Sequence, residues 1–378
     1  FGSSHFGSSQ GRAWVTPSSI RMAGAWALAT WFRAASAGPL AVFAALLWRL
    51  QLQQYPVLDR AKAQLLEGLT FAEGPRWRRG RLYFSDMWAD EVVAVEPASG
   101  RRQTVARFTG GGGDQPRRGP SGLGWLPNGT LLVSDMPGRR LLAFSGEEAP
   151  ERASTVHASV AELAPEIVND MCVAADGSAY IGGLWGFDMG LVEGKPPAAW
   201  PPAALRPTRL ARVAPDGTVS AATPEELVFP NGIVITPDGG TLLVAETFGQ
   251  RVSAYPRAAD GSLGERKTWA ELPWTFPDGM CLDASGALWV ALAGAGSFLR
   301  VSEGGKVHEV IPASPGYKAI AVMLGGDDGR TLFMLEAKGT GPEDVSKNGR
   351  ENSRIVMAHV DVPGATMPGN PNYFAGYC

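Results

Sequence analysis

Short apolar stretches separated by turn-forming residues recur along most of this chain, and the same arrangement returns six times. Each copy contains an alternating strand, a two-residue turn and a strongly apolar second strand, which together predict a β-hairpin. The first strands of the copies begin at Glu73, Ser121, Asn169, Asn231, Asp278 and, in a weaker sixth copy, Ala321.

Turn glycines and a fixed apolar pattern support this alignment. The turn pairs are Arg79-Gly80, Asn128-Gly129, Asp176-Gly177, Asp238-Gly239, Ser285-Gly286 and Asp328-Gly329. In the first five copies, the residues two and four positions into the first strand are Pro75 and Trp77, Leu123 and Trp125, Met171 and Val173, Ile233 and Ile235, and Met280 and Leu282. Because side chains alternate along a strand, both positions are expected on one buried face.

Further strands follow each hairpin, beginning near Glu91, Arg140, Arg209, Arg251, Phe298 and Arg354. Four strands that recur at roughly 45 to 50 residues are typical of a propeller blade. We therefore expect an all-β fold, a six-bladed β-propeller with four-stranded blades over residues 63–363. The segment 65–71 is expected to add a strand to the last blade, which closes the ring and removes exposed edges.

Composition agrees with one all-β domain and excludes some classes of function. The 378 residues include 48 glycines and 29 prolines, and this content favours short strands over long helices. The net charge of −3 provides no broad positive surface, so no nucleic-acid partner is expected. Three cysteines are too few for a disulfide framework, and Cys172 and Cys281 are expected to be buried thiols.

Residues 1–58 differ from the rest because they contain no Asp or Glu. The uncharged stretch Ala34–Trp48 is shorter than the ~20 residues of a membrane-spanning helix and suits a signal sequence. Counted from Met22, residues 22–50 would instead form a membrane anchor; an organelle transit peptide and a buried amphipathic helix are the alternatives. The expected destination is the secretory pathway or a membrane-anchored form, with organelle targeting as the alternative. Residues 364–378 are expected to form a C-terminal tail.

The starts of the six first strands carry the candidate chemistry. In a propeller these strands line the central channel, so the residues at their starts meet near one mouth. Four of the six equivalent residues are oxygen donors, namely Glu73, Asn169, Asn231 and Asp278, with Ser121 beside them. Two carboxylates and two amides suit a hard divalent cation such as Ca²⁺. No Cys or His shares this register, so a structural zinc site is not expected.

Ordinary turn chemistry is the alternative, because Asn-Gly and Asp-Gly are common turn dipeptides. Each hairpin already has its own turn pair, however, so Asn231-Gly232 and Asp278-Gly279 exceed what the turns need. Asn169-Asp170 and Glu73 do not belong to turn dipeptides at all. The register therefore favours the metal site.

These residues lie in the segments AEGPRW, VNDM, FPNGIVITPDG and FPDGM. The segments resemble the family of gluconolactonases, regucalcin (the senescence marker protein) and luciferin-regenerating enzymes, and the match runs from about Leu65 to Val362. The resemblance implies that Glu73, Asn231 and Asp278 ligate the metal and that Asn169 is a fourth ligand or a substrate contact. It also implies that Asp278 is the general base, and it leaves the metal open between Ca²⁺ and Zn²⁺.

One departure from the family pattern bears on the substrate. Regucalcin-like members carry an arginine two residues before the equivalent of Asn169, where this chain has Ile167. A contact suited to sugar hydroxyls or carboxylates is therefore missing, which favours a less polar lactone.

The expected function is metal-dependent hydrolysis of a small lactone by a monomeric catalytic domain. The ion would polarise the carbonyl, Asp278 would activate water, and Asn169 and Ser121 would contact the substrate. An organophosphate triesterase on the same site is one alternative, and a non-catalytic Ca²⁺-binding propeller is another. The predicted propeller, residues 63–363, contains no G-x-S-x-G segment, which argues against a serine hydrolase.

Overall fold

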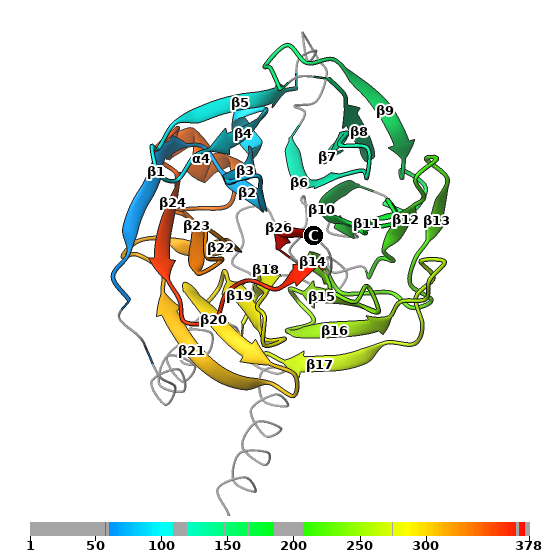
Figure 1. Cartoon of the computed structure of the whole chain (residues 1–378). Coiled ribbons are helices and arrows are strands. Elements are labelled where there is room, and N and C mark those ends of the chain that lie inside the picture. Colours follow the sequence, from blue (N-terminus) through cyan, green and yellow to red (C-terminus); the bar gives the residue numbers. More distant parts are fainter. Residues whose placement is uncertain are drawn as a thin grey trace, which may run out of the picture.

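Six four-stranded antiparallel sheets surround a central axis in the computed structural model (Figure 1). The structure describes residues 57, 60–108, 119–146, 148–164, 166–184, 207–273, 275–367 and 370–374. This arrangement confirms the all-β class, the six-bladed propeller and the four-stranded blades.

The blades follow one another in chain order. Blades 1 and 2 comprise β2 (Ala72–Arg78), β3 (Arg81–Asp86), β4 (Glu91–Val95) and β5 (Arg102–Arg107), then β6 (Pro120–Trp125), β7 (Leu131–Asp135), β8 (Arg140–Phe144) and β9 (Ser154–Ser159). Blades 3 and 4 comprise β10 (Ile167–Val173), β11 (Ala179–Leu184), β12 (Ala211–Val213) and β13 (Val219–Ala221), then β14 (Pro230–Ile235), β15 (Thr241–Glu246), β16 (Arg251–Pro256) and β17 (Lys267–Glu271). Blade 5 comprises β18 (Pro277–Leu282), β19 (Leu288–Leu292), β20 (Ser297–Ser302) and β21 (Lys306–Pro312).

The sixth blade joins the two ends of the propeller. It consists of β22 (Lys318–Gly325), β23 (Thr331–Ala337), β24 (Ser353–His359) and β1 (Ala63–Leu69). β1 pairs antiparallel with β24, so a strand from the start of the fold completes a sheet from its end (Figure 1). Upstream of β1, the Arg60 side chain hydrogen-bonds to Glu309 and Asp361. The predicted ring closure is thus confirmed.

Glycines occupy all six predicted hairpin turns in the left-handed region. Their φ values lie between 72° and 87° at Gly80, Gly129, Gly177, Gly239, Gly286 and Gly329. Residues other than glycine rarely adopt this backbone conformation, which explains why glycine occurs at each of these positions.

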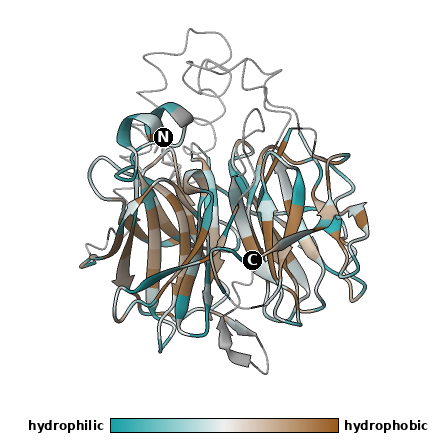
Figure 2. Cartoon of the chain, turned by 90° about the horizontal axis from the view of Figure 1, so that it is seen from above, coloured by the Kyte–Doolittle hydropathy of each residue, from teal (hydrophilic) through white to brown (hydrophobic). Residues whose placement is uncertain are grey.

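The apolar face predicted for each first strand packs against the preceding blade. Trp77 stacks on Phe333 of blade 6 with ring centroids 5.4 Å apart, and Trp125 meets Tyr83 of blade 1 edge-on at 5.0 Å. Apolar residues therefore concentrate on the strands of the blades, where Figure 2 shows the brown, hydrophobic stretches. These contacts fix the tilt of neighbouring blades and hence the direction in which the channel residues point.

Three shorter elements complete the described chain. A 3₁₀ turn, η1 (Met87–Ala89), follows β3, and a helix, α4 (Pro342–Asn348), precedes β24. The hairpin of β25 (Thr366–Met367) and β26 (Asn370–Phe374) brings β26 beside β2, near the middle of the ring in Figure 1.

The cysteines differ in part from expectation. Cys281 is a buried free thiol, as expected. Cys172 is also buried but is disulfide-bonded, with its partner outside the described residues, so the expectation of a free thiol there is wrong.

In the described part of the chain, no helix is long and apolar enough to cross a bilayer. The proposed leader and the anchor at residues 22–50 lie outside the described residues, apart from Val57.

Candidate active site in the central channel

Glycines next to the predicted site residues let the channel strands approach one another closely. A Cβ atom on Gly74 would lie 2.6 Å from the Ser121 carbonyl oxygen, and one on Gly232 would lie 2.5 Å from the Asp278 carbonyl oxygen. Both separations are too short for real atoms, so only glycine permits this spacing. Asn231-Gly232 and Asp278-Gly279 thus lie within strands β14 and β18 and serve the channel wall rather than turns.

A chain of hydrogen bonds links predicted site residues from successive blades. Ser121 Oγ donates to Asn169 Oδ1 at 2.7 Å, and Asn169 Nδ2 donates to Asn231 Oδ1 at 3.1 Å. Asn231 Nδ2 then donates to Thr247 Oγ1 at 3.2 Å. Blades 2, 3 and 4 therefore deliver their polar side chains to one place, as the register predicts.

Glu73 of blade 1 and Asp278 of blade 5 complete the group. Both side chains are buried, with residue exposures of 4% and 9%. Burial raises the pKa of each carboxyl well above its ordinary value, and the charge of Asp278 raises the pKa of Glu73 further. A hydrogen bond from Asn231 opposes the rise in the pKa of Asp278. The charge of Asp278 therefore opposes ionisation of Glu73.

The sixth position supplies no oxygen ligand. Ala321 is fully buried, and a Cβ on Gly279 would lie 2.5 Å from the Ala321 Cβ. Five blades therefore contribute a polar side chain to the site, and the sixth contributes a methyl group.

Hydroxyl groups on, or directly after, the second strands of the blades hold the backbone of the site. Ser85 Oγ donates to the Ser121 carbonyl at 2.7 Å, and Ser134 Oγ donates to the Asn169 carbonyl at 2.7 Å. Thr247 Oγ1 likewise donates to the Pro277 carbonyl at 2.8 Å. Each hydroxyl bonds the first strand of the next blade, which fixes the spacing of the side chains that face the channel.

Two charged residues of the channel were not among the predicted site residues. Asp170, next to Asn169, is buried; burial raises its pKa, and its charge raises the pKa of Glu73 and of Asp278. Arg76 is also buried and donates from Nη2 to the Met171 carbonyl at 2.7 Å. The signals in the sequence were an Arg inside an otherwise apolar strand and an Asp where four of the other five repeats have Gly.

The donor set fits a hard divalent cation. Within the described residues no three Asp, Glu, His or Cys side chains form a ready ligand cluster, so the amides of Asn169 and Asn231 are needed beside the carboxylates of Glu73 and Asp278. Carboxylate and amide oxygens are the ligands preferred by Ca²⁺. A bound cation would also offset the burial and the charge of Asp278, which oppose ionisation of Glu73.

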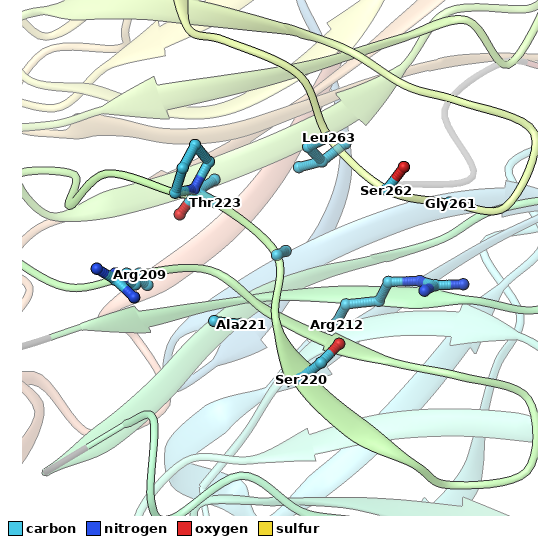
Figure 3. Close-up of a pocket in the computed structure, with 10 residues that line it drawn as sticks. Arg209, Arg212, Ser220, Ala221, Thr223, Gly261, Ser262 and Leu263 are labelled. Carbon is cyan, nitrogen blue, oxygen red and sulfur yellow. The ribbon is translucent and has the colours of Figure 1, made fainter.

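A separate pocket lies at the rim of blades 3 and 4. It is lined by Arg209, Arg212, Ser220, Thr223, Ser262 and Leu263, among others. The guanidinium groups of Arg209 and Arg212 point in opposite directions (Figure 3), so their charges do not converge on one ligand. The channel residues remain the better candidate site.

Comparisons with known proteins point to one family. The sequence profile described as "SMP-30/Gluconolactonase/LRE-like region" matches residues 71–338. A 6-deoxy-6-sulfogluconolactonase of Pseudomonas putida is 26% identical over 146 residues, which are 38% of this chain and 50% of that protein. Pentonolactonase XacC of Haloferax volcanii is 30% identical over 136 residues, 35% of this chain and 46% of that one. The chain thus spans about half the length of these two relatives.

Among solved structures, a luciferin-regenerating enzyme superposes with a TM-score of 0.64 at 17% identity. The superposition covers 81% of this chain and 98% of the other. At this identity the likeness concerns the fold alone.

Proposed function

Because this chain belongs to the SMP-30/gluconolactonase/LRE-like family, we propose that it hydrolyses a small lactone at the mouth of its channel. The names of the two lactonase relatives support this reaction class. Glu73, Asn169, Asn231 and Asp278 would hold one divalent cation, Ca²⁺ rather than Zn²⁺ given the all-oxygen donors. The observation that carries the proposal is the convergence of polar side chains from five blades on one place.

A bound divalent cation supplies a Lewis acid that polarises the lactone carbonyl and favours the ionised form of its ligands. Asp278 takes the proton from the attacking water at its carboxylate oxygen. The oxygen of that water bonds to the carbonyl carbon, the ring C–O bond breaks, and the proton passes to the ring oxygen. The product is an open hydroxy acid, and Asp278 returns to its starting state.

The surroundings of Asp278 suit this role. Its pKa is raised by burial and by the charge of Asp170, whereas the hydrogen bond from Asn231 opposes the rise. A general base acts most effectively when its pKa lies near the working pH rather than far below it. Asn231 also orients the carboxylate, so removing either side chain disturbs the other.

Ile167 and Ser121 bear on the choice of substrate. Ile167 begins β10, two residues before Asn169, and it offers an apolar side chain there. Ser121 Oγ donates a hydrogen bond to Asn169. It would therefore contact the substrate while it keeps this bond. A lactone with few polar substituents near this edge is therefore the preferred class.

A substrate panel tests the proposal. Purified protein, stripped of metal and resupplied with Ca²⁺ or Zn²⁺, is assayed in parallel against aliphatic lactones, sugar lactones and phosphotriesters. The proposal predicts lactone turnover that exceeds phosphotriester turnover, with aliphatic lactones preferred over sugar lactones. Turnover of phosphotriesters alone would assign the alternative hydrolase, and cation binding without turnover of any member would assign a binding module.

A further inference from the structure

Two residues before each of the six equivalent channel positions, the chain carries a residue without a polar side chain. These residues are Phe71, Gly119, Ile167, Phe229, Phe276 and Ala319. Because the first strands begin at the mouth that holds the candidate site, all six lie at this mouth. A hydroxyl group on a bound molecule would find no side-chain hydrogen-bond partner among them.

Three phenylalanine rings lie in a row on the side of blades 4 and 5. Phe229 precedes β14, Phe276 precedes β18, and Phe248 follows β15. The Phe248 ring meets the other two edge-on, with its centroid 4.7 Å from that of Phe229 and 5.6 Å from that of Phe276. All three residues are partly exposed. They form one apolar surface across two blades, the aromatic row.

The backbone connects the aromatic row to the candidate site. Phe229 and Phe276 lie two residues before the candidate ligands of blades 4 and 5. Thr247, the residue before Phe248, accepts a hydrogen bond from Asn231 Nδ2 at 3.2 Å. Each ring is therefore within two residues of a group in the site, and the row borders the site on this side.

Phe229 adopts a backbone conformation that bulky residues rarely take. Its φ is 61°, in the left-handed region. The other described residues with a positive φ that are not glycine lie in turns between paired strands; they are Arg79, Asp90, Arg139 and Gln250. Strained backbone of this kind clusters at functional sites. The strain at Phe229 therefore points to a requirement for an aromatic ring at this place, because glycine would fit the backbone more easily.

The other end of the row is held in place by Gly294. A Cβ atom on Gly294 would lie 2.3 Å from Cδ2 of Phe276, so the ring lies directly against the glycine backbone. The amide of Ala293 also donates to the Phe276 carbonyl at 3.0 Å. A surface that is fixed in this way loses little conformational freedom when a ligand binds.

We propose that the aromatic row is a specificity subsite that binds an unbranched alkyl substituent of the lactone. This inference deepens the proposed function and rests on it. Methylene groups that leave water to contact the rings contribute binding free energy in proportion to the apolar area that they bury. Hydroxylated substituents gain no such contribution.

A series of γ-lactones, from the unsubstituted ring to the hexyl derivative, tests the subsite. The kcat/KM should rise about two- to fourfold for each added methylene, mainly through KM. Phe248→Ala should lower the ratio of hexyl to unsubstituted kcat/KM at least tenfold, and Phe248→Leu should keep most of this ratio. An equal ratio in Phe248→Ala and the unsubstituted protein would overturn the proposal.

Phe108→Ala is the matched control. It removes a buried ring that lies 5.6 Å from the Phe144 ring, after β5 and away from the first strands, so it should leave the ratio unchanged. Phe229→Gly covers the case in which Phe248→Ala does not fold, because glycine suits the left-handed backbone. This variant should also lower the ratio, and an unchanged ratio would count against the subsite.

A binding experiment without hydrolysis separates this inference from the proposed function. 3-Hexylcyclopentanone and cyclopentanone, which contain no ester bond, are titrated into the protein in excess chelator. The hexyl compound should bind at least tenfold more tightly, and Phe248→Ala but not Phe108→Ala should remove the difference. This result would support the subsite even if no lactone is hydrolysed. Equal affinities for the two ketones, or lactone hydrolysis without a preference for longer chains, would overturn the subsite, and the second result would leave the proposed function intact.

Discussion

Asn169 and Asn231 are 62 residues apart in the chain, yet the Asn169 amide donates a 3.1 Å hydrogen bond to the Asn231 side-chain oxygen. The two residues occupy equivalent positions in consecutive blades, on β10 and β14. Ser121, in the preceding blade, donates a hydrogen bond to Asn169 and so extends this series of hydrogen bonds by one blade. The candidate site is therefore a product of the repeat, because neighbouring blades present the same register position to the channel.

Replacement of Asp278 by Asn should separate catalysis from folding. Activity on a lactone should fall by about 10³-fold, because the general base is lost. The metal-free melting temperature should rise, since a neutral amide replaces a buried carboxyl whose pKa is raised by burial and by Asp170. Asp238→Asn, at an exposed turn, is the control and should leave activity unchanged. A variant that unfolds would instead make Asp278 a structural residue.

Stability of the metal-free protein should fall as the pH rises. Burial raises the pKa of Glu73 and Asp278 well above their ordinary values of 4.5 and 3.8. Between those ordinary values and the raised ones, the folded state binds more protons than the unfolded state, so unfolding becomes easier with increasing pH. Melting curves in chelator across this range provide the measurement.

Ca²⁺ should weaken this trend, because it stabilises the ionised carboxylates in the folded state. The double variant Glu73→Gln/Asp278→Asn should flatten the pH profile even in chelator. A profile that stays unchanged in this variant would show that other groups cause the pH dependence.

Gly232→Ala should disturb the channel wall. The new Cβ would lie 2.5 Å from the Asp278 carbonyl oxygen, and overpacking of this kind costs about 1–3 kcal/mol of unfolding free energy. Gly264→Ala is a suitable control, because its Cβ would make only ordinary contacts, the nearest at 3.5 Å from Pro256. Denaturant unfolding should show a loss for Gly232→Ala and little change for Gly264→Ala. Equal free energies of unfolding for the two variants would mean that the channel strands can move apart at no cost in free energy.

Removal of β1 should open the ring. A shortened chain that begins at Thr70 leaves the backbone of β24 unpaired on one side, and exposed strand edges promote aggregation. A chain that begins at Val57 keeps β1 together with the Arg60 contacts to Glu309 and Asp361. Size-exclusion chromatography should show a monomer for the longer chain and aggregates for the shorter one. A stable monomer that begins at Thr70 would contradict closure by β1.

Local signals in the sequence were sufficient to predict the fold and part of the candidate site. The turn glycines, such as Gly129, adopt a left-handed conformation that other residues avoid, so each turn can be identified from the sequence. The hairpins define the register, and the register in turn places Asn169 beside Asn231. The closing strand β1 was likewise predictable, because a propeller without it would leave an edge exposed.

Arg76 and Asp170 could not be predicted in the same way. All seven residues of β2 are buried, so the alternation of polar and apolar residues that marks a one-sided strand is absent there. The register also shifts between Glu73 and Arg76, which breaks strict period-two counting. The partner of Arg76 is a backbone carbonyl, on Met171, and no side-chain pattern in the sequence identifies a backbone partner.

Calorimetric titration of the metal-free protein with Ca²⁺, with lactone hydrolysis assayed at each point, tests the central claim most directly. We predict that one Ca²⁺ binds per chain and that activity rises in proportion to the bound fraction. Glu73→Gln and Asp278→Asn should weaken binding. Full lactone hydrolysis in excess chelator, or Ca²⁺ binding unaffected by both substitutions, would contradict the account.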